Sequence, residues 1–170
     1  MLMSYRGMRP EIHETVFMVD SAIVIGDVKI GELSSLWFHA VVRGDVHYIR
    51  IGARTNVQDN STLHVTNDTF PLNIGDDVTI GHNATLHGCT IRDRCLIGMG
   101  AILLDGSEIG EDSIVGAGTL VKEGMKVPPR SLVVGLPGRV ARRLSDAEVA
   151  SLKKSALNYI GYSKEYMQEK

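Results

Sequence analysis

The sequence predicts a mainly β fold, a parallel β-helix of hexapeptide repeats followed by a C-terminal α-helix. A branched aliphatic residue recurs at every sixth position, a period that matches neither 3.6 nor 3.5 residues per turn of a helix. Glycine, asparagine and aspartate recur between these positions, as at the corners of short strands. Three six-residue steps make one triangular coil, so residues eighteen apart stack on one another.

The repeat occupies about residues 16–140 and slips at three places. About three residues are extra at 47–50, five are extra in a loop at 65–73, and one is missing at 88–90. Slips are where a regular scaffold carries function, so these places are candidates for a site. The inward aliphatic positions are Val24, Ile30, Leu36, Val42, Ile51, Val57, Leu63, Ile74, Ile80, Leu86, Ile91, Ile97, Leu103, Ile109, Val115, Val121, Val127 and Val133.

Both ends of the chain depart from the repeat. Residues 1–15 form a lead-in with little pattern, and Ser145 with Glu148 predicts a helix N-cap and capping box. We expect a β-helix domain at residues 1–144 and a helix at residues 145–168, which packs along the coils, on a neighbouring subunit or over the edge of the last coil. The approximate apolar stripe of this helix is Val149, Leu152, Leu157 and Ile160.

Composition narrows the classes of function. A chain of 170 residues with 5% aromatics and 18 glycines suits one narrow coil filled by medium-sized aliphatic residues. The net charge of -2 gives no reason to expect nucleic-acid or membrane binding. No long apolar run and no charged-then-apolar leader occurs, so we expect a cytoplasmic protein. Cys89 and Cys95 fall on adjacent faces of the coil and are expected to be reduced.

The repeat register brings two histidines together. His64 directly follows Leu63, and His87 directly follows Leu86. With residues 65–73 treated as a loop, the two leucines stack, so His64 and His87 point outward one coil apart, at roughly 4.8 Å. Two imidazoles at that separation can share one metal ion. Arg43 follows Val42 in the same column and extends this line.

A second polar line lies on another face. His82 stacks above Asp59, and Gly81 stacks above Gln58. Five extended residues between His82 and His87 span up to roughly 16 Å, so one chain hardly brings both to one ion. Two partial sites on two faces indicate a subunit boundary whose heterologous contact closes into a ring of three. A ladder of solvated, stacked histidines is the alternative; the clustering of charged and amide side chains in the same register favours the metal site.

The motifs in this register resemble those of the gamma-class carbonic anhydrases. The resemblance covers roughly residues 11–145 and implies a left-handed parallel β-helix, a homotrimer and a divalent metal between subunits. Hexapeptide repeats alone are shared with many acyltransferases, whereas the combined motif is specific. The matching segments are Ser35-Leu36-Trp37-Phe38, Val42-Arg43-Gly44-Asp45, Thr55-Asn56-Val57-Gln58-Asp59, Leu63-His64, Ile80-Gly81-His82, Leu86-His87-Gly88-Cys89 and Ile97-Gly98-Met99-Gly100-Ala101.

The resemblance also implies a role for each site residue. His64 and His87 of one chain and His82 of the next would bind Zn²⁺, although three histidines also suit Co²⁺ or Fe²⁺. Arg43 would hold the substrate oxyanion, with Asp45 and Asp59 orienting it. Gln58 would hydrogen-bond the metal-bound water or the substrate, and Asn56 would support the site. The implied reaction is reversible hydration of carbon dioxide to bicarbonate by zinc-bound hydroxide.

Two departures from the family pattern favour low activity. The best-studied members carry an acidic loop whose Glu moves protons away from the metal, whereas residues 65–73 offer only Asp68. Val46 also replaces another Glu of such members. A non-catalytic metal-bearing scaffold or assembly subunit, and a hexapeptide-repeat acyltransferase, are the alternative functions. The acyltransferase usually needs a long loop over its substrate groove, and residues 65–73 are the only excursion here.

Overall fold

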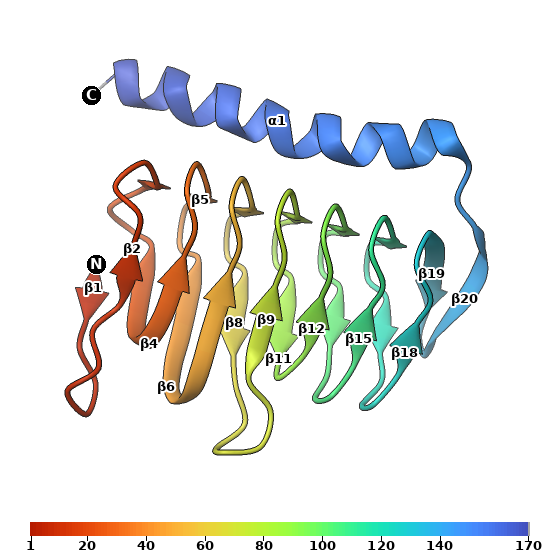
Figure 1. The fold of residues 1–170 in the computed structure, drawn as a ribbon, viewed down its shortest axis with the longest axis horizontal. Helices are drawn as coiled ribbons and strands as arrows, with labels where there is room; N and C mark the ends of the chain where they lie inside the picture. Colours follow the sequence, from red (N-terminus) through yellow and green to blue (C-terminus); the bar gives the residue numbers. More distant parts are fainter. Residues whose placement is uncertain (170) are drawn as a thin grey trace.

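The predicted β-helix is confirmed. The computed structural model describes residues 1–169, which form a parallel β-solenoid of about seven turns with a single helix beside it (Figure 1). The strands stack into three columns, one for each side of the triangular coil. We call these columns face 1, face 2 and face 3.

Two of the faces form one continuous sheet, because β4 and β6 bend around the corner between them. Face 1 comprises β1 (Leu2–Met3), β4 (Ile23–Ile30), β6 (Val41–Ile51), β8 (Thr62–His64), β11 (Thr85–His87), β14 (Ile102–Leu103) and β17 (Leu120–Val121). Face 2 adds β2 (Glu11–Ile12), β9 (Leu72–Ile74), β12 (Thr90–Ile91), β15 (Glu108–Ile109) and β18 (Lys126–Val127) to the second halves of β4 and β6.

Face 3 is a separate sheet. It comprises β3 (Phe17–Met18), β5 (Ser35–Leu36), β7 (Asn56–Val57), β10 (Thr79–Ile80), β13 (Leu96–Ile97), β16 (Ile114–Val115), β19 (Ser131–Gly135) and β20 (Gly138–Arg143). All its pairings are parallel except the last, in which β20 folds back antiparallel on β19. An uncovered edge strand would be free to pair with another chain. Here β20, rather than the terminal helix, pairs with β19 and covers the edge of face 3.

The strand register confirms the three slips. Coils of regular length pair residues eighteen apart, as in Ile91 with Ile109. Val42 pairs with Leu63 across twenty-one positions, which reflects the three extra residues before β7. Leu63 pairs with Leu86 across twenty-three positions because of the loop at 65–73, and Leu86 pairs with Leu103 across only seventeen.

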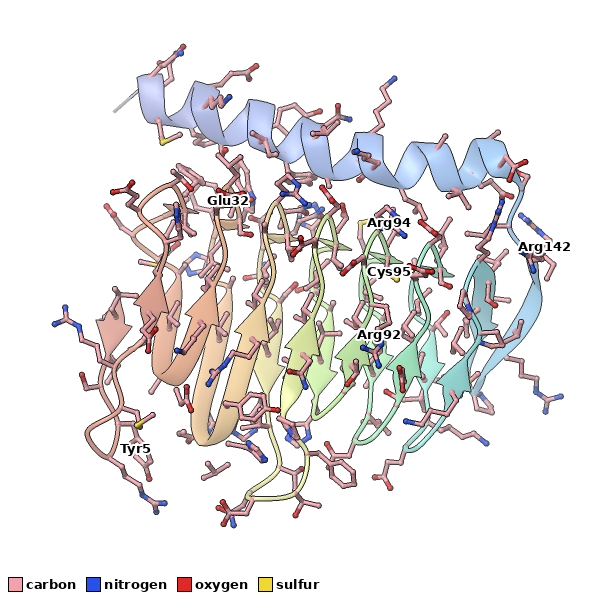
Figure 2. All side chains as sticks on the ribbon, in the orientation of Figure 1. Tyr5, Glu32, Arg92, Arg94, Cys95 and Arg142 are labelled. Atoms are coloured by element: carbon pink, nitrogen blue, oxygen red, sulfur yellow. The ribbon has the colours of Figure 1, made fainter. Side chains whose placement is uncertain are left out.

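The interior of the coils is filled by the aliphatic repeat. Most of the predicted inward positions have no solvent exposure at all, including Leu63, Leu86 and Leu103. Burial of these side chains removes apolar surface from water at every step of the stack, which holds the coils together. Cys89 and Cys95 are free thiols in this core, and neither is disulfide-bonded (Figure 2 labels Cys95).

Ion pairs join successive coils at one corner. Arg54 donates from Nε to Asp77 Oδ1 over 2.7 Å, and Arg94, labelled in Figure 2, does the same to Asp112 over 2.7 Å. All four residues have the left-handed backbone of a tight corner, with φ between 55° and 57°. The corner therefore places each guanidinium against the carboxylate of the next coil.

The lead-in is more regular than the sequence indicates. Leu2 and Met3 pair in parallel with Val24 and Ile25, so β1 extends face 1 by one strand. β2 adds in the same way to the second half of β4. The short strands carry too few residues for a period to be recognised, which explains why residues 1–15 show little pattern.

The predicted terminal helix is also confirmed. α1 (Asp146–Gln168) begins after Ser145, whose side chain accepts from the Glu148 backbone in a capping box. The helix lies along its own solenoid, where it contacts β5 and β10 (Figure 1). Ser155 Oγ lies 3.1 Å from Thr79 Oγ1 of β10. No helix within residues 1–169 is long and apolar enough to span a membrane.

The buried stripe of α1 differs from the predicted one. Leu152 is buried as expected, but Leu157 is 48% exposed. Ala156 and Ser163 are buried in its place, because small side chains allow the helix to approach the coils closely. Tyr159 packs edge-on against Trp37 with ring centroids 5.5 Å apart.

Candidate metal centre

His64 and His87 lie side by side at the ends of β8 and β11, with their rings tilted by 58°. They are direct partners in the parallel pairing of these strands, as the repeat register predicts. The Nδ1 atom of His64 lies 3.1 Å from the Nε2 atom of His87. Two nitrogens bound to one tetrahedral zinc at 2.0–2.1 Å are about 3.3 Å apart. The separation therefore matches one edge of a zinc coordination tetrahedron.

A carboxylate stands behind each imidazole. His64 Nε2 lies 3.0 Å from Asp45 Oδ1, and His87 Nδ1 lies 2.6 Å from Asp105 Oδ1. An ionised carboxylate only accepts, so each of these outer nitrogens carries its proton toward the Asp. When both rings are neutral, the inner nitrogens are both unprotonated, and their lone pairs converge. Such an arrangement repels itself unless a cation lies between the lone pairs, so this donor pair fits a metal.

Asp105 belongs to this cluster of side chains, although no motif in the sequence points to it. It precedes Gly106 in the corner that follows β14, and its second oxygen accepts from Thr66 Oγ1 over 2.5 Å. It lies eighteen residues after His87, one position beyond the seventeen-residue coil that stacks Leu103 on Leu86, so a count along the column would have ended one residue short of it. The aliphatic repeat does not mark it, because it lies at a corner rather than at an inward position.

Arg43 and Asp45 extend the line below His64 on β6. The Arg43 guanidinium donates from its NH1 atom to Asp45 Oδ2, while Asp45 Oδ1 faces His64. Arg43 is 42% exposed and Asp45 is 14% exposed, so the cation reaches solvent while its carboxylate partner is largely covered. The order Arg43, His64 and His87 along face 1 agrees with the predicted column.

Burial and hydrogen bonding shift the proton affinities in this line. Burial of the His64 ring, the largest influence, lowers the pKa of this imidazole below its usual 6.5, although Asp45 opposes the shift. Burial pushes the pKa of the Asp45 carboxyl upward, but hydrogen bonds with His64 and Arg43 outweigh it, so this pKa lies below its usual 3.8. Both shifts favour a neutral imidazole beside an ionised carboxylate.

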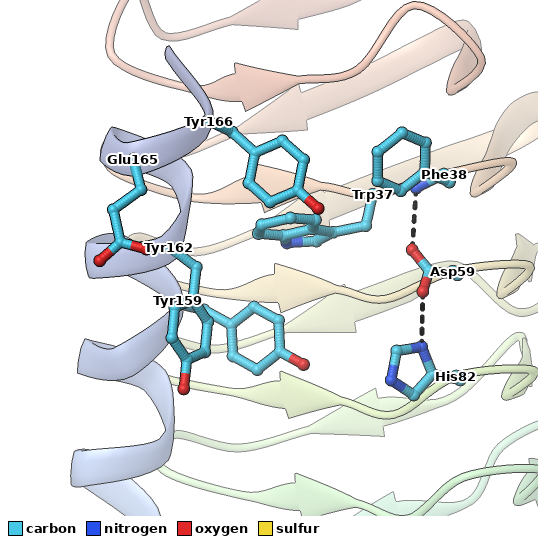
Figure 3. Close-up of a pocket in the computed structure, with 8 residues that line it drawn as sticks. All are labelled: Trp37, Phe38, Asp59, His82, Tyr159, Tyr162, Glu165 and Tyr166. Carbon is cyan, nitrogen blue, oxygen red and sulfur yellow. Dashed lines mark hydrogen bonds and ion pairs between the residues drawn. The ribbon is translucent and has the colours of Figure 1, made fainter. Parts of the chain in front are cut away.

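His82 lies apart from this pair, on the corner that follows β10. Its Nδ1 atom lies 2.9 Å from Asp59 Oδ2, and the ring is 41% exposed (Figure 3). Asp59 also accepts from the Phe38 backbone N–H over 3.0 Å. Within residues 1–169 the Asp59 carboxylate therefore bonds to His82 and Phe38. The predicted contact between Asp59 and Arg43 is not formed within a single chain. Residues 1–169 also contain no group of three His, Cys, Asp or Glu side chains that could hold a metal ion.

Gln58 and Asn56 form a buried amide pair beneath His82. Gln58 Nε2 donates to Asn56 Oδ1 over 3.1 Å, and Asn56 Nδ2 donates to Thr79 Oγ1 over 3.1 Å. Both amides are at most 5% exposed. Asn56 therefore fixes which way the Gln58 amide points, and Thr79 connects the pair to α1 through Ser155.

A pocket of about 290 Å³ opens between this corner and α1. Figure 3 shows His82 and Asp59 on one side of it and the tyrosines of α1 on the other. Trp37 forms its floor, with its ring 5.3 Å from that of Tyr166. The exposed His82 ring therefore borders a hollow and is free to meet a group from outside this chain.

Comparison with known proteins identifies the family of the chain. The family profile "Bacterial transferase hexapeptide (six repeats)" matches residues 88–123. Protein YrdA of Escherichia coli is 47% identical over 99% of this chain and 95% of its own length. Gamma carbonic anhydrase 2 of Arabidopsis thaliana, a mitochondrial protein, is 42% identical over 99% of this chain and 62% of its own length.

A solved structure supports the fold independently. The crystal structure of a hexapeptide transferase family protein from Anaplasma phagocytophilum superposes with a TM-score of 0.93 at 39% identity, covering 97% of each chain. The repeat, the histidine register and these near full-length similarities point to one group of proteins. The chain belongs to the gamma-class carbonic anhydrase family of hexapeptide-repeat proteins.

Proposed function

We propose that this chain hydrates carbon dioxide reversibly at a zinc site shared between two copies in a homotrimer. The observation that carries the proposal is the approach of two ring nitrogens, His64 Nδ1 and His87 Nε2, to 3.1 Å, with a carboxylate on the far side of each ring. When the rings are neutral, these carboxylates hold both in the tautomer whose unprotonated nitrogens face one another. The similarity to proteins named carbonic anhydrases supports the choice of reaction.

The third ligand in this proposal is His82 of a neighbouring copy. Its Nδ1 atom is engaged by Asp59, so Nε2 is the nitrogen that presents a lone pair outward. Three neutral imidazoles suit zinc, and they also accept Co²⁺ or Fe²⁺. When bound, zinc acidifies water so that hydroxide is available near neutral pH.

Arg43 would bind the negatively charged oxygen of the substrate or product. Its guanidinium is half-exposed beside the histidine pair, and Asp45 holds it by a charged hydrogen bond. Asp45 contacts both Arg43 and His64, so one carboxylate fixes the positions of the anion-binding group and a metal ligand together. Gln58, oriented by Asn56, supplies an amide for hydrogen bonding to the substrate.

Asp59 would have two roles in this proposal, holding His82 of its own chain and orienting an arginine of the neighbour. In the single chain its carboxylate holds His82, and in the proposed trimer it would also approach Arg43 of the neighbour. Proton release is the weak part of the site, because Val46 and the loop at 65–73 offer no Glu. We therefore propose slow turnover compared with members of the family that carry an acidic loop.

The test is stopped-flow measurement of carbon dioxide hydration by purified protein loaded with zinc, cobalt or iron under anaerobic conditions. Hydration above buffer that requires metal supports the proposal. A trimer that binds metal but shows no hydration would instead support a non-catalytic scaffold. The name of the Anaplasma relative, a hexapeptide transferase family protein, raises group transfer as a second candidate, and metal-free transfer from an acyl thioester would favour it.

A further inference from the structure

Asp105 connects a histidine of the proposed metal site to the loop at residues 65–73. One of its oxygens accepts from His87 Nδ1 over 2.6 Å, and the other accepts from Thr66 Oγ1 over 2.5 Å. Both oxygens of this carboxylate are therefore engaged, one by a candidate ligand and one by the loop. A carboxylate held at both oxygens cannot rotate freely, so it fixes the plane of the His87 ring.

The backbone around Asp105 is shaped for this contact. A Cβ atom at Gly88 would lie 2.3 Å from Asp105 Oδ1 and 2.7 Å from the Cβ of Phe70, so only glycine leaves room for both. Gly88 also has a φ of +53°, in the left-handed region where glycine is favoured. A Cβ at Gly106 would come within 3.0 Å of the Phe70 ring. Through Phe70, the loop at 65–73 therefore packs against Gly88 and Gly106, the two corner glycines beside the Asp105 carboxylate.

The loop also reaches the support of the other histidine. Its own ends are closed by backbone hydrogen bonds between Thr66 and Phe70, 3.1 and 3.3 Å long. The Asp68 N–H donates to the Val46 carbonyl over 3.2 Å, directly after Asp45 on β6. Residues 65–73 therefore contact the Asp105 side chain behind His87 and the backbone next to Asp45, which stands behind His64.

We propose that Asp105 is a positioning residue that fixes His87 as its Nδ1–H tautomer, and that Thr66 makes this fixation depend on the loop. The inference rests on the proposed function in one respect, namely that His87 is a metal ligand through Nε2. A carboxylate that accepts from the far nitrogen of a ligating imidazole orients the ring and raises its basicity, and its loss typically weakens metal binding 10- to 100-fold, as an order of magnitude. The loop then sets metal affinity without touching the metal.

Three variants of the full chain test the inference. Asp105→Ala removes the acceptor, Thr66→Val removes only the hydroxyl at similar volume, and Asp112→Asn neutralises a comparably half-buried carboxylate at a distant corner as the control. Zinc affinity is measured by competition with a chromophoric chelator at fixed pH. We expect weakening of roughly 10- to 100-fold for Asp105→Ala, about 3- to 10-fold for Thr66→Val, and no change for Asp112→Asn.

A second readout needs no metal. ¹⁵N chemical shifts of the His87 ring in metal-free protein report which nitrogen carries the proton. The wild type is expected to show protonated Nδ1, and Asp105→Ala is expected to show a mixture of tautomers. Wild-type tautomer and affinity in Asp105→Ala would overturn the inference. If the wild type binds no zinc but the tautomer changes as expected, the proposed function fails while the positioning of His87 by Asp105 stands.

Discussion

The Nδ1 atom of His64 and the Nε2 atom of His87 face one another at 3.1 Å, although twenty-three positions separate the residues in the chain. Each ring is hydrogen-bonded to a carboxylate on its far side, so the facing nitrogens are both lone-pair donors. A regular coil has eighteen residues, and the loop at 65–73 supplies the five extra positions between the two histidines. This pair is one half of the proposed metal site, and the exposed His82 is the half offered to a neighbour.

Complementation between variants tests whether the site is shared. Separate His64→Ala and His82→Ala proteins should each lose most of their bound zinc, measured by mass spectrometry of the metal. Mixing the two after denaturation and refolding should restore part of it, because the His64→Ala chain supplies His82 to the intact pair of the other. A site formed within one chain would gain nothing from mixing. His13→Ala, at an exposed histidine bonded to Thr15, is the control.

Substitution of Arg43 should separate metal binding from turnover. Arg43 donates to Asp45, and a lysine can still pair with that carboxylate, so Arg43→Lys should retain its zinc. A lysine keeps the charge but lacks the planar fork that holds a carboxylate and an anion together, so kcat/KM for hydration should fall by at least about tenfold. Metal analysis and stopped-flow assays on the same sample check this expectation. Equal kcat/KM in both proteins would remove Arg43 from the reaction.

The stability of metal-free protein should decline in two steps as the pH falls. His64 has a pKa below 6.5 when folded, so the unfolded chain binds its proton first, and stability decreases as the pH falls below 6.5. Asp45 has a pKa below 3.8 when folded, so a further decrease begins as the pH falls below 3.8. Denaturant titrations with a chelator present measure both steps. His64→Gln should abolish the first step and diminish the second, because His64 is one of the partners whose hydrogen bond lowers the Asp45 pKa.

Loss of the helix cap should destabilise the protein without affecting the site. Ser145 caps α1 through the Glu148 backbone, so Ser145→Ala should lower the free energy of unfolding by about 1 kcal/mol. Ser151→Ala is the matched control, because Ser151 lies inside the helix and donates only to the Glu148 carbonyl. Chemical denaturation measures the difference. An equal loss in both variants would show that the cap contributes nothing specific.

The two thiols should be protected from alkylation in the folded protein. Burial, the largest influence, raises the pKa of both Cys89 and Cys95 to about 12, and only the thiolate reacts rapidly. Mass spectrometry after iodoacetamide treatment at pH 8 should show unmodified native protein and two modifications in denaturant. Rapid native modification of either residue would mean that its coil opens on the time scale of the experiment.

Much of this molecule is determined by the sequence because a fixed period assigns every residue to a coil and a face. The stacking of His64 on His87, and of both on Arg43, follows from counting aliphatic positions and allowing for three slips. The helix after Ser145 follows from its capping box. In each case the information is local in the chain, or repeats along it, so it can be recognised without knowing where the side chains lie.

The partners of the corner residues were decided only by the tertiary structure. Asp105 behind His87 and the burial of Ala156 in place of Leu157 do not appear in the repeat. The six-residue period specifies the inward positions on straight strands, where close packing accepts only a few types of side chain. At corners, the direction of a side chain depends on the turn and on what the neighbouring coil, loop or helix offers, and those contacts exist only once the chain has folded.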